Sequence, residues 1–536
     1  MHKRLIALFA SVLFAFSGII ARVYRLTEQG YAEVAEEQSS LTITVATARG
    51  TLYDRNLTAL TNAGSHYAAG VISTPEALAA LSESMTAEAW ESVREQLESG
   101  KPAVLTSDEA FPLANGIRQF VVPQRYGGGL AAHVIGYVGA DGRGVCGAEL
   151  ALEEVLSKAS GKLTVTYRTD GTGSVLTGSE VIVENTLNRA TAGAALTIDS
   201  RMQAMLETVA GERISRGAAV VLDIESGDIL AMASYPDYDP TDLTAYLDDK
   251  DSPLFDRTTA AYNCGSVFKI VTAMAALERG TTAATSFTCA GALQVGSNRI
   301  KCHHILGHGT LDLFGAFRES CNPYFIQLAH LGGAASLYRY ASLLSFDSPL
   351  FLMNGWQTAR ATLPQETELL QATRLANVSI GQGDLLATPL HVAAMTACVA
   401  RGGSYLRPNL YLGTVDTQGN LTRAAADPPS RICSEQTAAT LRQMMQEVVS
   451  DGTGTAAAPS VGTAAGKTGT AETGWRTDDG STMVHSWFTG YYPAEDPQYV
   501  ITVLAENGSN TDEATAPVFA ALCDRLYRMG YVKIPS

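Results

Sequence analysis

A serine and a lysine three positions apart open an apolar stretch in the second half of the chain. Ser266 and Lys269 are followed by apolar residues as far as Leu277, and the pattern predicts a helix over 266–279. Positions i and i+3 share one helix face, so the amine should lie beside the hydroxyl. Burial disfavours the charged form of lysine, and a neutral amine can act as a base toward the serine. The N-terminus of such a helix also offers free backbone N–H groups to a developing oxyanion.

Taken alone, this pair is better explained as a helix cap and a lysine that reaches to solvent. Two later segments change that interpretation. Ser320 and Asn322 form an S-x-N pattern, and Lys467 begins the sequence Lys-Thr-Gly-Thr in a region predicted as a strand. A lysine on a strand, followed by a glycine, can hold a carboxylate while the backbone comes close to a substrate. Each pattern is weak by itself, but S-x-x-K, S-x-N and K-T-G in this order are a strong combined signal.

The elements that must position these motifs are predicted from apolar runs separated by polar turn residues. Strands are predicted at 218–223, 229–233, 485–492 and 499–505. Ser226-Gly227-Asp228 joins the first two as a hairpin turn, and a helix at 516–529 closes the chain. A long helical block, roughly 266–451, lies between the two groups of strands. This order predicts an α+β domain whose sheet is built from both ends of the segment.

The first half of the chain has a mixed pattern and no predicted catalytic cluster. An Ala- and Glu-rich helical stretch is predicted at 75–98, and strand-like runs at 119–122 and 180–184. The length of 536 residues predicts two or three domains. Asp and Glu number 54 against 38 Lys and Arg, and this net charge of −16 argues against nucleic acid as a partner. Eight cysteines are too few for a disulfide scaffold.

An uncharged apolar run near the N-terminus predicts a membrane anchor. It extends from Leu5 to Ala21, and at ~1.5 Å per residue it reaches ~26 Å, the lower limit for a spanning helix. The alternative is a cleaved signal peptide, but the sequence before Ala21 lacks the small residue that an A-x-A-like site needs. Lys3 and Arg4 place the N-terminus inside by the positive-inside rule, and the rest of the chain outside the membrane.

The sequence resembles the class B penicillin-binding proteins, which are membrane-anchored peptidoglycan D,D-transpeptidases. Besides the three motifs, the resemblance rests on segments spread over nearly the whole chain: Arg49–Asn56, Arg125-Tyr126 with Ala131–Gly136, Leu196–Asp199, Gly217–Tyr235, Gly381–Gly383, Gly466–Glu472 and His485–Phe488. The chain departs from the family pattern at Cys264, Leu57 and Gly127, where proline, glycine and proline are usual. None of these departures removes a chemical group, so they bear on local geometry and antibiotic fit.

The resemblance implies an α+β fold with a penicillin-binding transpeptidase/β-lactamase-like domain, in which a helical subdomain accompanies a five-stranded antiparallel sheet. A mixed α/β pedestal and one transmembrane helix should precede this domain. The predicted organisation is a cytoplasmic N-terminus at 1–4, an anchor at 5–24, a pedestal or dimerisation domain at 25–210 and a transpeptidase domain at 211–536. The expected location is the bacterial cell membrane, with a single pass and the catalytic domain outside.

The resemblance also implies a role for each motif residue. Ser266 would attack the penultimate D-Ala of a stem pentapeptide, Lys269 would take the hydroxyl proton, and Ser320 would relay a proton to the leaving amine. Backbone N–H groups of Ser266 and Thr470 would form the oxyanion hole. The implied substrate-binding residues are Asn322, Lys467, Thr468, Gly469 and Thr470.

The implied partners are stem peptides ending in D-Ala-D-Ala, β-lactams and a polytopic membrane glycosyltransferase, because class B members lack that activity; no cofactor is expected. One alternative is a β-lactamase or D,D-carboxypeptidase, although the long first half argues against a plain β-lactamase. Another is a non-catalytic scaffold or β-lactam sensor. The complete motif set argues against a scaffold, and the four residues before the predicted anchor leave little room for a sensor's signalling domain. The sequence leaves open whether the chain serves elongation, septation or sporulation.

A group of cysteines and histidines lies between the first two motifs. Cys302, His303, His304 and His308 fit no zinc spacing template, so we predict no metal and expect the histidines to lie in a loop. Cys289 and Cys302 enclose a short loop that looks similar in related proteins, which implies a disulfide; two packed thiols are the alternative.

Overall fold

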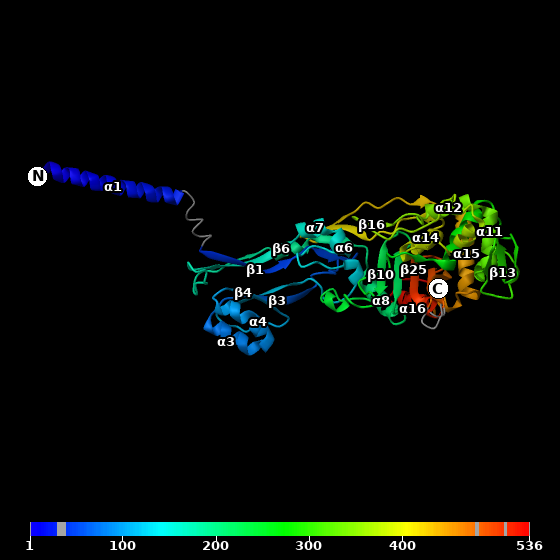
Figure 1. Cartoon of the computed structure of the whole chain (residues 1–536), viewed down its shortest axis with the longest axis horizontal. Helices are drawn as coiled ribbons and strands as arrows, with labels where there is room; N and C mark the ends of the chain where they lie inside the picture. The colour runs from blue at the N-terminus through cyan, green and yellow to red at the C-terminus, as the bar shows by residue number, and fades with distance from the viewer. Residues whose placement is uncertain (1, 29–38, 477–481, 509–511, 535–536) are drawn as a thin grey trace. The chain divides into compact units, whose positions relative to one another are not determined.

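The computed structural model describes residues 2–28, 39–476, 482–508 and 512–534, and it divides into two compact units (Figure 1). Met1, at the predicted cytoplasmic end, lies outside the described residues, and so do residues 29–38 of the predicted pedestal and 477–481, 509–511 and 535–536 of the predicted transpeptidase domain. The first unit comprises Met1–Gly50, Asn62–Arg125 and Ala159–Thr191, and the second Thr51–Thr61, Tyr126–Lys158 and Ala192–Ser536. Three segments of the predicted pedestal range, 51–61, 126–158 and 192–210, therefore fold with the second unit, and the predicted domain boundary at 210 and 211 stays a prediction.

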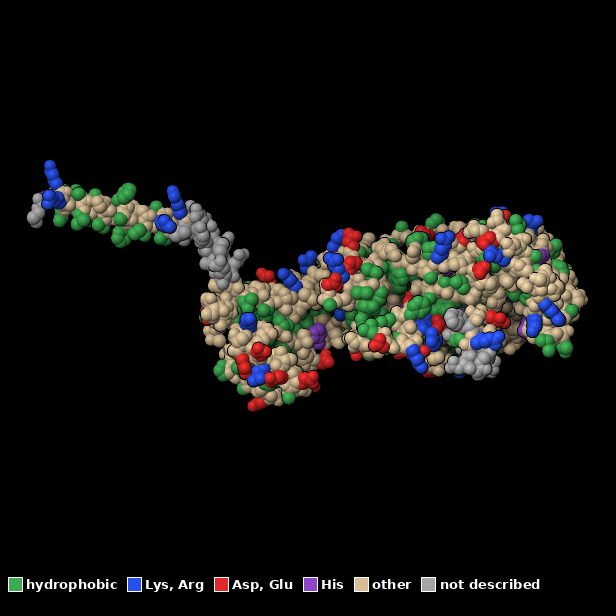
Figure 2. Space-filling model, in the orientation of Figure 1, with side chains coloured by type: hydrophobic (Ala, Val, Ile, Leu, Met, Phe, Trp, Pro, Cys, Tyr) green, Lys and Arg blue, Asp and Glu red, His purple; other side chains and the backbone are tan. Residues whose placement is uncertain are grey.

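The chain begins with the long helix α1 (His2–Glu28). Its portion His2–Arg25 has a mean hydropathy of 2.1 and, among the described residues, is the one helix long and apolar enough to cross a membrane. Figure 2 shows apolar side chains along this helix and basic side chains near both ends. The predicted anchor at 5–24 falls within this helix.

The rest of the first unit consists of two small antiparallel sheets with helices beside one of them. One sheet has the order β1-β6-β7 (Ser40–Ala48, Gly161–Arg168, Ile182–Asn185), and the other β4-β3-β5 (Ala103–Ser107, Gly64–Val71, Ile117–Gln124). The short helix η1 spans Leu187–Thr191. The helical stretch predicted at 75–98 is two helices, α3 (Pro75–Ser84) and α4 (Ala87–Glu98). They are separate because Met85 is extended and the Thr86 side chain caps α4.

The second unit is built on a five-stranded antiparallel sheet, which confirms the predicted fold. Its strand order is β10-β9-β25-β24-β23, with bounds Ile229–Tyr235, Gly217–Asp223, Tyr499–Gly508, Thr482–Tyr492 and Ala465–Arg476. The four strands predicted in this unit are all present. In the predicted hairpin turn, Asp223 accepts from the backbone N–H of Ser226 and Gly227 has a φ of 77°. The edge strand β23 carries Lys467–Thr470, as the position of K-T-G predicted.

Both faces of this sheet are covered, because successive side chains on a strand point to opposite faces. Ala219, Val221 and Val503 pack with α8 (Ser200–Gly211) and α16 (Asp512–Arg528) on one face (Figure 1). Val518, Leu522 and Leu526, whose i+4 spacing predicted the closing helix, are fully buried there. The opposite face joins the larger core, in which Ala218, Val220 and Trp487 pack with the helical block.

The helical block supplies the other side of the site. Its helices are α9 (Lys269–Glu278), α10 (Leu313–Arg318), α11 (Asn322–Gly332), α12 (Ala334–Leu343), α13 (Ala372–Ser379), α14 (Pro389–Ala400) and α15 (Glu435–Asp451), with short helices η2 (Leu243–Tyr246), η3 (Gly265–Phe268) and η4 (Thr455–Ala457). α14 is buried at every position, which is why it reads as continuously apolar rather than amphipathic.

Short strands and helices complete the second unit. A four-stranded sheet has the order β2-β8-β20-β21 (Thr51–Tyr53, Gly193–Leu196, Tyr411–Val415, Leu421–Arg423). The two-stranded pairs are β11–β18 (Tyr262–Asn263, Leu386–Ala387), β12–β15 (Phe287–Cys289, Gly309–Leu311), β13–β14 (Ala292–Val295, Asn298–Lys301), β16–β17 (Phe351–Met353, Trp356–Gln357) and β19–β22 (Ser404–Tyr405, Ser430–Arg431). The small helices α5, α6 and α7 span Ala132–Ile135, Gly147–Ala151 and Glu153–Lys158.

Candidate active site

Ser266 lies in the tight helical turn η3, which leads directly into α9. The predicted helix over 266–279 therefore begins as a 3₁₀ turn and becomes α-helical at Lys269. The preceding Gly265 has a φ of 59°, and a Cβ there would lie 2.3 Å from the carbonyl oxygen of Thr470. Only glycine allows so close an approach. The serine-bearing turn thus packs directly against β23, which brings the first and third motifs together.

The side chain of Lys269 is completely buried and points at the second motif. Its Nζ donates to the backbone carbonyl of Ser320 at 2.6 Å and to Oδ1 of Asn322 at 2.7 Å, and it lies 3.1 Å from Oγ of Ser320. Burial lowers the pKa of Lys269 to about 7, against an opposing effect of Cys321 and Cys302. This is the depressed pKa that the apolar pattern around Lys269 predicts, and it leaves a substantial neutral fraction at neutral pH.

A second buried lysine reaches the same serine from the sheet. Nζ of Lys467, on β23, donates to Oγ of Ser320 at 3.0 Å and to the carbonyl oxygen of Thr468 at 3.1 Å. Each lysine also lies near an aromatic ring of the helical block, Lys269 over Phe325 and Lys467 over Phe317. The hydroxyl of Ser320 is therefore held between two amines, an arrangement that allows a proton to move between groups without solvent.

The backbone of Ser320 adopts a conformation that is uncommon for a side-chain-bearing residue. Its φ is 52°, in the left-handed region, and it lies between the end of α10 and the start of α11. Such a conformation costs energy and persists only where the surrounding contacts hold it. The S-x-N pattern predicted the residue types but gave no sign of this strained turn.

The remaining residues of the third motif have distinct surroundings. The hydroxyls of Thr468 and Thr453 are 2.8 Å apart. A Cβ at Gly469 would lie 2.9 Å from Cγ1 of Val267, so this glycine lets β23 approach the serine-bearing turn. Thr470 accepts a hydrogen bond at its carbonyl from Nε2 of Gln382 at 3.3 Å. The predicted roles of these residues in holding a substrate stay predictions.

Three residues near the site were given no role by the sequence. The carbonyl of Gly381 accepts from the N–H of Gly265 at 2.9 Å, and Gln382 contacts Thr470. Both belong to the Gly-Gln-Gly segment that carried part of the resemblance, so a signal for them was present. Thr453, beside Thr468, follows α15 in a Gly-Thr-Gly sequence that carried no signal of its own.

The two cysteines predicted to form a disulfide are close together, and both are buried free thiols. Cys289 and Cys302 lie in a group with His308 and Cys321 in which all ligand atoms are within 4.8 Å of one another. The disulfide stays a prediction. Cys264, which precedes Gly265, is fully buried, and burial raises the pKa of its thiol well above the usual range.

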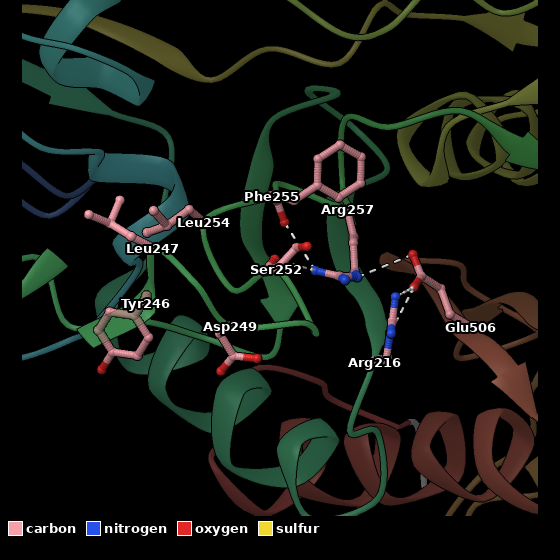
Figure 3. A pocket seen from close by; sticks show the side chains of 9 residues that line it. All are labelled: Arg216, Tyr246, Leu247, Asp249, Ser252, Leu254, Phe255, Arg257 and Glu506. Atoms are coloured by element: carbon pink, nitrogen blue, oxygen red, sulfur yellow. Dashed lines mark hydrogen bonds and ion pairs between the residues drawn. The ribbon is translucent and has the colours of Figure 1, made fainter. Parts of the chain in front are cut away.

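A separate cavity of about 590 Å³ contains none of the predicted site residues. It is lined by Arg216, Tyr246, Leu247, Asp249, Ser252, Leu254, Phe255, Arg257 and Glu506 (Figure 3). Within it, Glu506 lies 3.2 Å from both Arg216 and Arg257.

The antiparallel sheet, the helical block and the meeting of the three motifs define a transpeptidase/β-lactamase-like fold. Residues 217–524 match the penicillin binding protein transpeptidase domain family. The chain belongs to this family, and its two-unit architecture is that of a class B penicillin-binding protein.

Known relatives agree with this assignment. Over 333 residues the chain is 34% identical to the peptidoglycan D,D-transpeptidase PbpA of Mycolicibacterium smegmatis, covering 57% of this chain and 65% of PbpA. The chain thus spans less than two thirds of that relative's length. The D,D-transpeptidase domain of a peptidoglycan glycosyltransferase from Eggerthella lenta has a solved structure with a TM-score of 0.65 at 26% identity, covering 90% and 99% of the two chains. A complex of PBP2 and MreC from Helicobacter pylori has a TM-score of 0.68 at 22% identity, covering 92% of this chain and 99% of that chain.

Proposed function

We propose that this chain is a serine-type peptidoglycan D,D-transpeptidase that cross-links stem peptides through an acyl-enzyme and is acylated by β-lactams. The observation that carries the proposal is the convergence of three motifs on one hydroxyl: Lys269 and Lys467 each lie within hydrogen-bond distance of Oγ of Ser320. Ser266 lies on the turn that leads into the helix of Lys269 and packs against β23.

In the acylation step, Oγ of Ser266 attacks the carbonyl carbon of the penultimate D-Ala. The neutral amine of Lys269 accepts the hydroxyl proton, as its burial favours. The peptide bond breaks, the new ester bond forms on Ser266, and the terminal D-Ala leaves as an amine that receives a proton through Ser320. Lys467 contributes positive charge near the terminal carboxylate, and backbone N–H groups of Ser266 and Thr470 hold the oxyanion.

In the second step, an amine from a neighbouring stem peptide attacks the ester. The acyl group moves to that amine, and the oxygen of Ser266 takes back a proton. Asn322, whose Oδ1 accepts from Lys269 at 2.7 Å, would hydrogen-bond the donor peptide when it is bound. No cofactor is needed for either half of this reaction.

The proposed location is the bacterial cell membrane, with α1 as a single-pass anchor. Basic residues at the start of α1 favour an inside N-terminus, which leaves the second unit outside, where peptidoglycan is cross-linked. Because class B members lack their own glycosyltransferase, a polytopic membrane glycosyltransferase is the partner that would supply glycan strands. The complex of Helicobacter pylori PBP2 with MreC supports protein partnership for this fold.

The test is labelling of the full-length chain in detergent with a fluorescent penicillin, followed over hours beside Ser266→Ala. We expect a stable adduct on the wild-type chain and none on the variant. Ser11→Ala, at an exposed serine of α1, is the matched control and should label like wild type. Labelling of Ser266→Ala at the wild-type rate would overturn the assignment.

The same labelling, combined with an assay of stem-pentapeptide turnover, separates the alternatives. A label that forms and is lost within seconds is the behaviour of a β-lactamase. Release of D-Ala from a stem pentapeptide without cross-linked product is that of a D,D-carboxypeptidase. A folded chain that takes no label and forms no cross-links is a scaffold or sensor.

A further inference from the structure

Four potential metal ligands converge beside the second motif. They are Cys289, Cys302, His308 and Cys321, and their ligand atoms all lie within 4.8 Å of one another. The three cysteines are buried and His308 is partly buried. Sγ of Cys302 lies 3.5 Å from Nδ1 of His308. A group of three thiols and one imidazole, gathered this closely and shielded from solvent, is unusual among side chains that have no shared ligand.

The spacing matches tetrahedral coordination. With metal–sulfur bonds of ~2.3 Å and metal–nitrogen bonds of ~2.0 Å, ligand atoms in a tetrahedral zinc site lie roughly 3.5 to 3.8 Å apart. The Cys302–His308 distance of 3.5 Å already has this value. The other pairs of ligand atoms are at most 4.8 Å apart, about 1 Å more than in a zinc site, and rotation of the side chains can remove this difference.

The backbone is shaped to bring these ligands together. Cys289 ends β12 and pairs with Gly309, the first residue of β15, so His308 directly precedes the residue that Cys289 pairs with. The backbone N–H of Cys302 donates to the carbonyl of Gly291 at 2.9 Å. A Cβ at Gly307 would lie 2.3 Å from the carbonyl oxygen of Cys289, so this loop needs a glycine to close over the group.

We propose that Cys289, Cys302, His308 and Cys321 bind one zinc ion in a closed structural site. Thiolate and imidazole ligands suit zinc and exclude magnesium and calcium, which take oxygen ligands. Four protein ligands leave no open coordination position for substrate or water, so the ion acts on structure. Binding forms three zinc–sulfur bonds and one zinc–nitrogen bond, and each thiol that is protonated releases its proton to solvent.

This proposal replaces our expectation of no metal. The sequence grouped Cys302 with His303, His304 and His308, a set that matches no zinc template. The fold instead brings in Cys289 through a strand pair and Cys321 from within the S-x-N motif. His303 and His304 are exposed.

Because of the position of Cys321, a bound ion would also affect the second motif. Cys321 lies between Ser320 and Asn322, both of which contact Lys269. Nδ2 of Asn322 donates to the carbonyl of Lys301, the residue before Cys302, at 3.3 Å. An ion that fixes Cys321 to Cys302 would therefore hold the strained turn at Ser320 in place. Cys321 would be a positioning residue, since it acts through its neighbours.

The first test measures metal on the full-length chain in detergent by elemental mass spectrometry. We expect about one zinc per chain in the wild type and loss of it in Cys302→Ser and His308→Ala. Cys146→Ser, at a cysteine outside the group, should keep its zinc. If a ligand variant fails to fold, the wild-type chain is loaded with cobalt in place of zinc and its absorption spectrum is recorded. Thiolate-to-cobalt charge-transfer bands and tetrahedral d–d bands support the site, and the absence of these bands overturns it. A Cys289–Cys302 disulfide found by peptide mass in the folded chain also overturns it.

The second test separates the ion from the proposed activity. Ser266→Ala should bind zinc like the wild type, because Ser266 is not a ligand, even though it takes no penicillin. In the wild type, chelation should slow penicillin labelling at least tenfold, and added zinc should restore it. Labelling that is unchanged by chelation would overturn the positioning role, whereas a wild-type chain that holds zinc but never labels would contradict the transpeptidase proposal alone.

Discussion

Nζ of Lys467 lies 3.0 Å from Oγ of Ser320, although 147 residues separate the two in sequence. The lysine is on the edge strand of the sheet and the serine is in a turn of the helical block. Their contact closes the interface between sheet and helices at the point where Lys269 also arrives. The chemistry of this protein therefore depends on how well the two halves of the domain are docked.

Replacing the buried base should abolish most of the acylation rate. In Lys269→Met the amine is absent while the apolar volume is kept, so we expect the rate of penicillin labelling to fall ~10²- to 10⁴-fold, the usual contribution of a general base. The rate is measured by stopping the labelling reaction at successive times and quantifying the labelled protein. Lys158→Met, at an exposed lysine paired with Glu154, is the matched control and should label normally. Equal loss in both variants would contradict a specific role for Lys269.

The pH dependence of acylation should report the same lysine. The neutral amine is the base, and burial lowers its pKa to about 7, so the labelling rate should rise with pH through about 7 and level off above it. An ordinary lysine, titrating near 10.5, would place the rise more than three pH units higher. Second-order labelling rates between pH 5 and 9, with circular dichroism to verify folding, distinguish the two.

The left-handed backbone of Ser320 predicts that catalysis and stability respond differently to substitution. Both Ser320→Ala and Ser320→Gly remove the hydroxyl held by the two lysines, so both should lose labelling. Glycine tolerates the φ of 52°, whereas alanine does not, so Ser320→Gly should be more stable than Ser320→Ala by about 1 kcal/mol. Thermal unfolding of the two variants measures the difference. An alanine variant as stable as the glycine variant would show that the turn is not strained.

The close approach of Gly265 to Thr470 predicts a strong effect from one methyl group. In Gly265→Ala the new Cβ would lie 2.3 Å from a backbone oxygen, so the serine-bearing turn must move away from β23. A misplacement of about 1 Å at a reacting group costs roughly 10²-fold in rate, and we expect a loss of labelling of that size. Gly127→Ala, where a Cβ has nothing within 4 Å, should behave like the wild type.

A buried histidine far from the motifs predicts acid sensitivity. Burial lowers the pKa of His391 from 6.5 to about 4, and its ring nitrogens contact Thr388 and Ser348. The folded chain therefore favours the neutral ring, and the stability this gives is present above pH 6.5 and is lost as pH falls toward 4. The full effect is ~3 kcal/mol. Urea unfolding of the wild type should show this slope between pH 6.5 and 4, and His391→Gln should flatten it.

Much of the fold was predictable because its signals are local. The strands around Ser226 are continuous apolar runs on either side of a polar turn, and the closing helix has apolar residues four apart. The helical stretch at 75–98 was predicted as one helix because the break at Met85 and Thr86 involves no proline or glycine. The segments that carry β2 and β8 fold with the second unit because β2 pairs with β8 and β8 pairs with β20, contacts that no local pattern reveals.

The sequence by itself singled out the candidate catalytic residues, because S-x-x-K, S-x-N and K-T-G constrain residue types at short spacing. The apolar residues around Lys269 also determined its burial, and with it the direction of its pKa shift. Only the tertiary structure decided that both lysines share the hydroxyl of Ser320, that this serine adopts a left-handed turn, and that Cys321 joins Cys289, Cys302 and His308. These contacts join segments distant in sequence, and the apolar pattern of one segment shows which of its faces is buried but not which other segment covers that face.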